Sequence, residues 1–122
     1  MKSVLVLAAA ALTATPAAAQ NFSCRNTEAE IRCDSGKCEV ETGSFTPMGL
    51  NRTGTRLEIC AYSGCWSGPI ATRRTLGPYQ VITAWVQGRE RGAPDPLAVI
   101  YDHKGKIAQM RWGGFANAMT CE

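Results

Sequence analysis

Short stretches in which apolar and polar residues alternate recur along this chain, separated by glycine, proline, asparagine and serine. The most regular stretch spans residues 79–87 (YQVITAWVQ) and is rich in the β-branched and aromatic residues that favour strands. Its apolar side chains occupy both faces, because Tyr79, Val81 and Trp85 alternate with Ile82, Ala84 and Val86. Such a strand is covered on both sides, or its outer face meets a partner.

Turn-forming residues recur about every eight to twelve residues, which is typical of an all-β domain. Further strands are expected at 30–34, 37–42, 45–50, 55–61, 97–102 and 106–112, and one that starts at residue 66 or at residue 70 and ends at 75. In the first hairpin, the alternation predicts that Ile31, Cys33, Cys38 and Val40 face inward and that the charged residues face outward. Residues 51–54 are expected to form a turn, 88–96 irregular structure, and 115–119 a short turn of helix.

About eight short strands in consecutive order predict an all-β fold, a small antiparallel meander. Such a meander closes as a barrel or packs as a two-sheet sandwich, and both arrangements remove exposed strand edges. A barrel of eight short strands is just filled by its own side chains, so we expect a packed core.

The first residues have the pattern of a secretory signal peptide. Met1 and Lys2 precede an uncharged, alanine-rich run, Pro16 interrupts it, and three alanines at 17–19 suit signal peptidase. Residues 20–122 would then form a single domain, which is as much as so short a chain can build. No second apolar run is long enough to span a membrane. The sequence therefore predicts a periplasmic or secreted protein.

Six cysteines follow the predicted cleavage point, and an even number in a small exported chain indicates disulfides. Six cysteines allow 15 pairings, which hairpin geometry narrows. Two C-x4-C pairs bracket turn-forming residues, so each can bridge a hairpin, and the remaining two lie near the ends of the mature chain. The expected pairs are Cys33–Cys38, Cys60–Cys65 and Cys24–Cys121.

The same two C-x4-C pairs could in principle supply four thiolates to zinc. Their spacing lies at the long end of the range that zinc sites use, and thiols oxidise in an exported setting, so the sequence favours disulfides. No metal site and no cofactor is predicted.

The charge of the chain argues against nucleic acid as a partner. Thirteen Lys and Arg oppose ten Asp and Glu, for a net charge of +3. Basic and acidic residues are interspersed, which is typical of a solvated surface rather than a polyanion-binding patch.

The best candidate for a binding site lies at residues 60–68 (CAYSGCWSG). Tyr62 and Trp66 stand there among small polar residues, Ser63 included, inside an expected local disulfide. Rigid aromatic residues among adaptable small ones are typical of recognition loops. Arg73 and Arg74 follow and could receive acidic groups. Alternatively Trp66 caps the core, as tryptophan is usually well buried; Trp85 and Trp112 are assigned to the core.

Candidates for catalysis are sparse. His103 is the single histidine of the chain and lies in an expected turn, and no serine-hydrolase or metal-binding motif is present. A small ribonuclease-like hydrolase would use Glu58 as base and His103 as acid, with Arg73 or Arg74 holding a phosphate. The spacing of these residues is not diagnostic, and a non-catalytic protein is favoured.

The general plan resembles the small exported β-barrel proteins with which bacteria inhibit host lysozymes. Those proteins are short meanders of about eight strands with a disulfide and a Ser-Gly-containing loop. Ser63-Gly64 matches that loop here, whereas Cys65-Trp66 replaces the aromatic residue expected after it, and the extra cysteines also depart from the pattern. The sequence predicts an exported binding protein, monomeric or weakly dimeric, that recognises a protein or a glycan of the cell envelope. The resemblance implies a more specific function of this kind, the inhibition of lysozyme.

Overall fold

A computed structural model describes residues 20–62, 64–90 and 92–122; the predicted signal peptide at 1–19 lies outside the described residues. The described part contains strands and no helix, so none of it could cross a membrane as a helix. The strands are β1 Phe22–Arg25, β2 Glu30–Asp34, β3 Lys37–Glu41, β4 Met48–Thr53, β5 Arg56–Ala61, β6 Gly64–Leu76, β7 Tyr79–Val86, β8 Asp95–Asp102, β9 Ile107–Trp112 and β10 Phe115–Cys121. The all-β prediction is confirmed.

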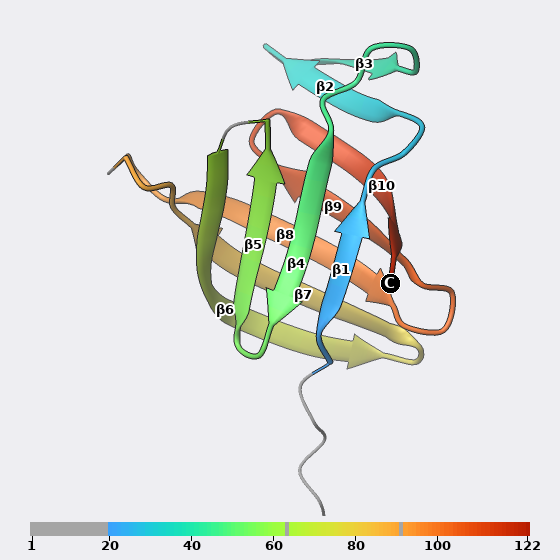
Figure 1. Cartoon of the computed structure of the whole chain (residues 1–122), viewed down its shortest axis with the longest axis vertical. Coiled ribbons are helices and arrows are strands. Elements are labelled where there is room, and N and C mark those ends of the chain that lie inside the picture. Colours follow the sequence, from blue (N-terminus) through green and yellow to red (C-terminus); the bar gives the residue numbers. More distant parts are fainter. Residues whose placement is uncertain (1–19, 63, 91) are drawn as a thin grey trace, which may run out of the picture.

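Eight of these strands form a closed antiparallel barrel (Figure 1). Strand β1 pairs with β4, strands β4 to β10 follow in chain order, and β10 returns to pair with β1. Closure gives each barrel strand two neighbours and leaves no free edge in the ring. Of the two architectures that the sequence allowed, the structure therefore has the barrel.

The barrel interior is filled by apolar side chains that alternate with outward-facing ones along each strand. Leu50, Leu57, Ile59, Ile82 and Val86 are fully buried in it. The core extends toward both ends of the barrel. The rings of Phe22, at the start of β1, and Tyr101 stack at 4.2 Å between centroids. Near the opposite, upper end, where β6 begins and β9 turns into β10, the rings of Trp66, Trp112 and Phe115 lie in a row.

Trp85 and Trp112 were both predicted to lie in the core, and the structure confirms this for only one of them. Trp112 is buried, as predicted, whereas the assignment of Trp85 to the core is wrong, because its side chain is 58% exposed. The alternation along β7 explains the difference: Ile82, Ala84 and Val86 face the interior, which leaves Trp85 on the outer surface.

Strands β2 and β3 form a hairpin that lies outside the ring and is attached to it through β10 (Figure 1). Arg32 and Glu39 are exposed, as predicted, but the inward direction predicted for Ile31, Cys38 and Val40 is wrong, and so is the outward direction of Glu30. Ile31 is 39% and Val40 66% exposed, whereas Glu30 is only 1% exposed. The short pairing of β2 with β10, Ala116 opposite Ile31, sets which face of the hairpin turns toward the barrel.

Glu30 is buried at the base of this hairpin, where one of its two carboxylate oxygens has polar partners and Oε2 has no hydrogen-bond partner among the described residues. Its Oε1 accepts a hydrogen bond from Thr46 Oγ1 at 3.4 Å and forms an ion pair with Arg32. A buried carboxylate needs such partners, because desolvation of an unpaired charge is costly. The ion pair thus accounts for a charged residue at a position where the alternation predicted a solvent-facing one.

The structure differs from the expected elements at three places. Residues 22–25 form a strand, β1, that was not expected. Strand β4 begins at Met48 and runs through Thr53, so most of the expected 51–54 turn belongs to a strand. Residues 115–119 belong to strand β10 rather than to a turn of helix. In the last two cases pairing with neighbouring strands overrides weak local preferences for turn or helix.

The three disulfides join the expected partners. Cys33–Cys38 and Cys60–Cys65 each link directly opposite residues of a hairpin, and Cys24–Cys121 links β1 to β10 across 97 residues of sequence. The two local disulfides brace turns, whereas the third ties the strands whose pairing closes the barrel. Three structural disulfides indicate an oxidising compartment outside the reducing cytosol.

We expect the disulfide Cys24–Cys121 to contribute most to stability. On the chain-entropy description of cross-links, its long loop is worth about 4.7 kcal/mol, against about 2.2 kcal/mol for a six-residue loop. The Cys24→Ser/Cys121→Ser double variant should therefore lose more free energy of unfolding than Cys33→Ser/Cys38→Ser, measured by urea denaturation of the oxidised proteins. An equal loss in the two variants would contradict the central role of barrel closure.

Candidate binding site at the upper end of the barrel

The turn between β5 and β6 presents an exposed tyrosine in a strained conformation. Ala61 and Gly64 are the last paired residues, so Tyr62 lies in a two-residue turn, with the Cys60–Cys65 disulfide directly behind it. Tyr62 has φ = 47° and is 82% exposed. A bulky side chain in the left-handed region costs free energy, and such outliers concentrate at functional sites. The disulfide helps to hold the turn that imposes this conformation.

Trp66, one of the first residues of β6, connects this turn to the core. Its side chain faces the barrel, its ring lies 4.9 Å from that of Trp112, and the two planes are tilted by 50°. Gly64 and Gly88 flank the indole so closely that a Cβ on either would lie 2.8 Å from it. The two glycines therefore make room for Trp66. Its ring is half-buried, so it closes the core and also borders the surface.

A cavity of about 640 Å³ lies beside Trp66. The β5–β6 region forms one side of it, and Gly88, Arg89 and Glu90 form the other. The segment after β7 is held in place by two backbone hydrogen bonds between Ser67 and Gln87, at 3.0 and 3.1 Å. The Gln87 side chain also donates to the Gly92 carbonyl at 2.7 Å. Arg89 and Glu90 are exposed and carry opposite charges, so the cavity has no strong net charge.

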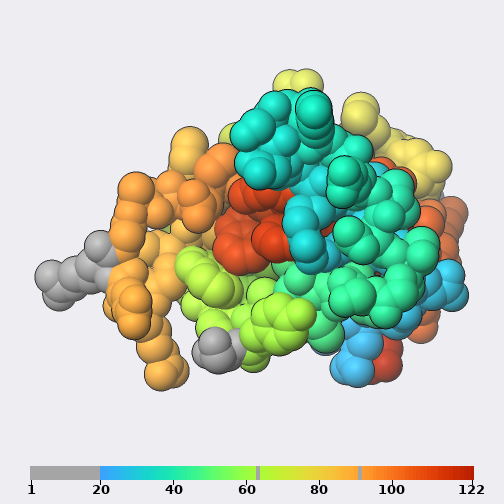
Figure 2. Space-filling model, turned by 90° about the horizontal axis from the view of Figure 1, so that it is seen from above, coloured from blue at the N-terminus to red at the C-terminus, as the bar shows by residue number. Residues whose placement is uncertain are grey.

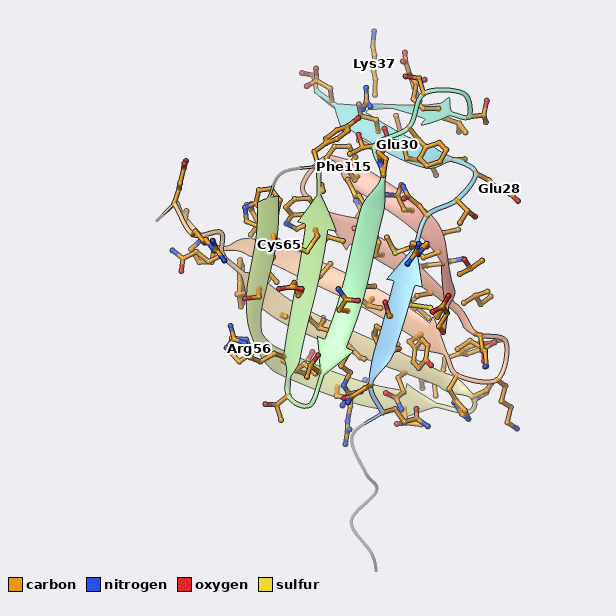
Figure 3. All side chains as sticks on the ribbon, viewed as in Figure 1. Glu28, Glu30, Lys37, Arg56, Cys65 and Phe115 are labelled. Carbon is orange, nitrogen blue, oxygen red and sulfur yellow. A yellow bond between two sulfur atoms is a disulfide. The ribbon has the colours of Figure 1, made fainter. Side chains whose placement is uncertain are left out.

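Seen from above, this end of the molecule is bordered by three segments that are far apart in sequence (Figure 2). The β2–β3 hairpin, the β5–β6 turn and the segment after β7 surround part of the β9–β10 region. Figure 3 shows Phe115 and Glu30 at the same end, beneath the hairpin. Phe115 continues the aromatic row, with its ring centre 6.2 Å from that of Trp112.

The structure brings together only some of the residues predicted to bind. Tyr62 and Trp66 lie at the upper end, while Ser63 lies outside the described residues. Arg73 and Arg74 are exposed on the far half of β6, where they pair with Ile82 and Val81 of β7. At about 3.3 Å per residue, Arg73 lies roughly 23 Å along the strand from Trp66. The two arginines are therefore not part of the upper end.

Arg73 belongs instead to a basic region near the lower end. There the buried Arg52 donates hydrogen bonds to the Gly54 carbonyl at 3.1 Å and to Gln80 Oε1 at 3.0 Å. Burial lowers the pKa of Arg52, and the nearby charge of Arg73 lowers it further. Arg52 thus fills the lower end of the barrel with a polar group whose hydrogen bonds are satisfied.

The hydrolase pairing of Glu58 with His103 does not form. Glu58 projects outward from the middle of β5, whereas His103 lies in the turn after β8. Strands β6 and β7 separate β5 from β8, which corresponds to about 14 Å along the barrel wall. A general base and acid acting on one substrate must lie within hydrogen-bonding reach of it. This arrangement gives the proposed pair no shared site.

Glu58 also lies within 4.8 Å of the sulfur atoms of Cys60 and Cys65. Those two sulfurs are joined to each other, so in this state neither is a thiolate that could hold zinc. Figure 3 shows Cys65 on the upper half of the barrel and Arg56 near the lower end of β5.

Reasoning from the sequence missed the second side of the cavity. Gly88, Arg89 and Glu90 lie in the segment predicted to be irregular, and nothing in its pattern shows which part of the molecule it approaches. A possible signal was the presence of charged residues in a loop that directly follows the most strand-like segment, since binding residues are often on loops.

Comparisons with known proteins identify no relative. No family model matches the chain, and no curated protein or solved structure is significantly similar to it. The function must therefore be argued from the site.

We expect Trp66 to contribute to stability as well as to the surface. Trp66→Ala should reduce the free energy of unfolding by about 2–3 kcal/mol, less than the 3–5 kcal/mol typical of a fully buried tryptophan. Trp85→Ala is the matched control, because the same side chain is mostly exposed there; it should cost under about 1 kcal/mol. Urea denaturation of the two variants tests the difference, and equal losses would contradict the described position of Trp66.

Proposed function

We propose that this protein is a non-catalytic, disulfide-stabilised binding protein of the periplasm or the secreted fraction, which recognises a protein or a glycan of the cell envelope. The contact would be made at the upper end, by Tyr62, Trp66 and the cavity beside them. The observation that carries this proposal is the exposed Tyr62 with its positive φ, in the turn that the Cys60–Cys65 disulfide brackets; Cys65 and Trp66, which follow that turn, line the cavity. A positive φ is uncommon for a bulky residue, and such outliers cluster at functional sites.

The chemistry of the site suits a neutral ligand with both apolar and polar groups. The rings of Tyr62 and Trp66 offer apolar area at little entropic cost. Arg89 and Glu90 supply hydrogen-bond donors and acceptors at the rim of the cavity. Because their charges oppose each other, the site has no preference for a polyanion. A sugar chain and a protein loop both combine apolar surface with hydrogen-bonding groups.

Two further observations support an exported protein. The three disulfides suit an oxidising compartment, and residues 1–19 have the pattern of a signal peptide. Periplasmic or secreted localisation is part of the proposal.

Inhibition of a cell-wall-cleaving enzyme such as lysozyme is a more specific candidate within the same proposal. The closed eight-stranded barrel is the architecture that the resemblance implies, and the matching Ser63-Gly64 directly follows the exposed Tyr62. Because unrelated functions share a fold, this candidate needs its own assay.

The variant Tyr62→Asn tests the proposal, because it separates binding from folding. Asparagine tolerates the left-handed conformation better than tyrosine and suits a two-residue hairpin turn, so we expect stability to rise by about 0.5–1 kcal/mol. Loss of the exposed ring should weaken binding at least about tenfold, since aromatic anchors of this kind are worth 2 kcal/mol or more. Retention on purified peptidoglycan and inhibition of lysozyme are the two binding measurements.

Ser35→Asn is the matched control. Ser35 also has a left-handed φ, of 50°, and also lies in a turn bracketed by a C-x4-C disulfide, at the tip of the projecting hairpin. It should leave binding unchanged. If Tyr62→Asn binds peptidoglycan or lysozyme as well as the parent protein does, the upper end is not the site; if the parent protein binds neither, the two named targets are wrong.

A further inference from the structure

The outer surface of the barrel carries an unusual concentration of exposed apolar side chains. In the described part of the chain, eight large hydrophobic residues are exposed, and all but Tyr62 lie on β2, β3 and β6 to β9. We call this surface the outer wall and define it by Ile31, Tyr79, Val81, Trp85, Ile100 and Ile107, with Val40 and Leu76 at its margins. Apolar patches of this extent mark interaction sites more often than free surface.

The strand register places the residues of the outer wall in neighbouring rows, which Asp102 and Arg111 interrupt. Val81 lies opposite Ile100, Tyr79 lies opposite Asp102, and Asp102 in turn lies opposite Ile107. A parallel row runs from Ala98 on β8 through Arg111 and Ala116 to Ile31 on the hairpin. Directly opposite residues on one face of a sheet have their side chains in contact range. The hairpin therefore extends the wall beyond the barrel.

The surface of the outer wall has both projecting side chains and hollows. Small side chains at Ala98, Ala116 and Ala118 leave a hollow of about 480 Å³ bordered by Ile31 and Ile100. A second hollow of about 230 Å³ lies beside Trp85, between it and Ala98. Trp85 and Ile100, 58% and 46% exposed, project next to these hollows.

The central hollow carries little charge. Arg111 is the charged residue among those that line it, and its guanidinium is directed toward the hairpin, with Nη1 3.5 Å from the sulfur of Cys33. The lining of this hollow is thus mostly apolar, and Gln109 and Arg111 are the exposed polar residues on its β9 side.

We propose that the outer wall is the interface of a symmetric homodimer. A twofold interface uses the same patch on both copies, so that patch must carry projections and the hollows that receive them. The outer wall has both. With Val40 and Leu76 included, the exposed fractions of the wall residues correspond to roughly 700 Å², close to the 800 Å² or so that each partner contributes to a standard interface.

This inference goes beyond the proposed function and does not depend on it. Tyr62 and the cavity beside Trp66 lie at the upper end, whereas the centre of the wall is on β7, β8 and β9. A dimer formed through the wall leaves Tyr62 free on each copy, so ligand binding and self-association can be measured separately.

Sedimentation velocity of the oxidised protein, over a concentration series from micromolar to sub-millimolar, tests the proposal. We expect a concentration-dependent shift from monomer to dimer. Ile100→Glu places a charge at the centre of the wall and should weaken the dimer at least about a hundredfold, because an unpaired charge is costly to bury. Trp85→Glu is a second variant on the same wall and should act in the same direction.

Tyr62→Glu is the control, since it places the same charge on an exposed aromatic position away from the wall. It should leave the dimer unchanged. Circular dichroism and urea denaturation check that each variant is folded, which both exposed wall positions should allow. A parent protein that stays monomeric at the highest concentration, or a dimer that both folded wall variants retain, would overturn the proposal.

Discussion

The pairing of β1 with β10 is the contact on which the rest of the structure depends. These strands come from opposite ends of the described chain, and Cys24 lies directly opposite Cys121 in their register. Both cysteines are buried, so the disulfide is part of the core and also links two strands of the barrel. Without this contact the meander would be an open sheet with two free edges and an exposed apolar face. Apart from the disulfide, only the short pairing of β1 with β10 keeps the barrel closed.

Closure also determines where the two ends of the barrel lie and what each can do. Arg52 and its hydrogen bonds fill the lower end. The upper end has an aromatic row instead, and Trp66 at the end of that row is both core and surface. A binding site built on such a residue is rigid, because the same contacts that support the fold hold the ring in position. If the proposed site is correct, a change at Trp66 would affect folding and binding together, whereas Tyr62 can be changed with little effect on the fold.

Two misread segments show the limits of local pattern. In the hairpin, Arg32 and Glu39 are exposed as predicted, but Ile31 and Val40 are exposed as well and Glu30 is buried, because the hairpin lies outside the ring and β2 pairs with β10. In β7, apolar residues on both faces left two options open, and the structure shows the outer face exposed at Trp85. In both cases the missing information was which neighbour each face meets.

The amino-acid sequence by itself determined the fold class, the disulfide pairing and the hairpin that presents Tyr62. The fold class, the two local disulfides and the hairpin follow from short-range physics: alternation with a period of two, turn-forming residues, and cysteines close enough to bridge a hairpin. The pair Cys24–Cys121 followed by elimination, as the two cysteines left near the ends of the mature chain. Tertiary structure alone decided that the meander closes as a barrel, that Arg73 and Arg74 lie far from Trp66, and that Gly88, Arg89 and Glu90 approach it. It also separated the apolar residues of the core from those of the outer wall. These outcomes depend on contacts between residues distant in sequence, which local patterns do not specify.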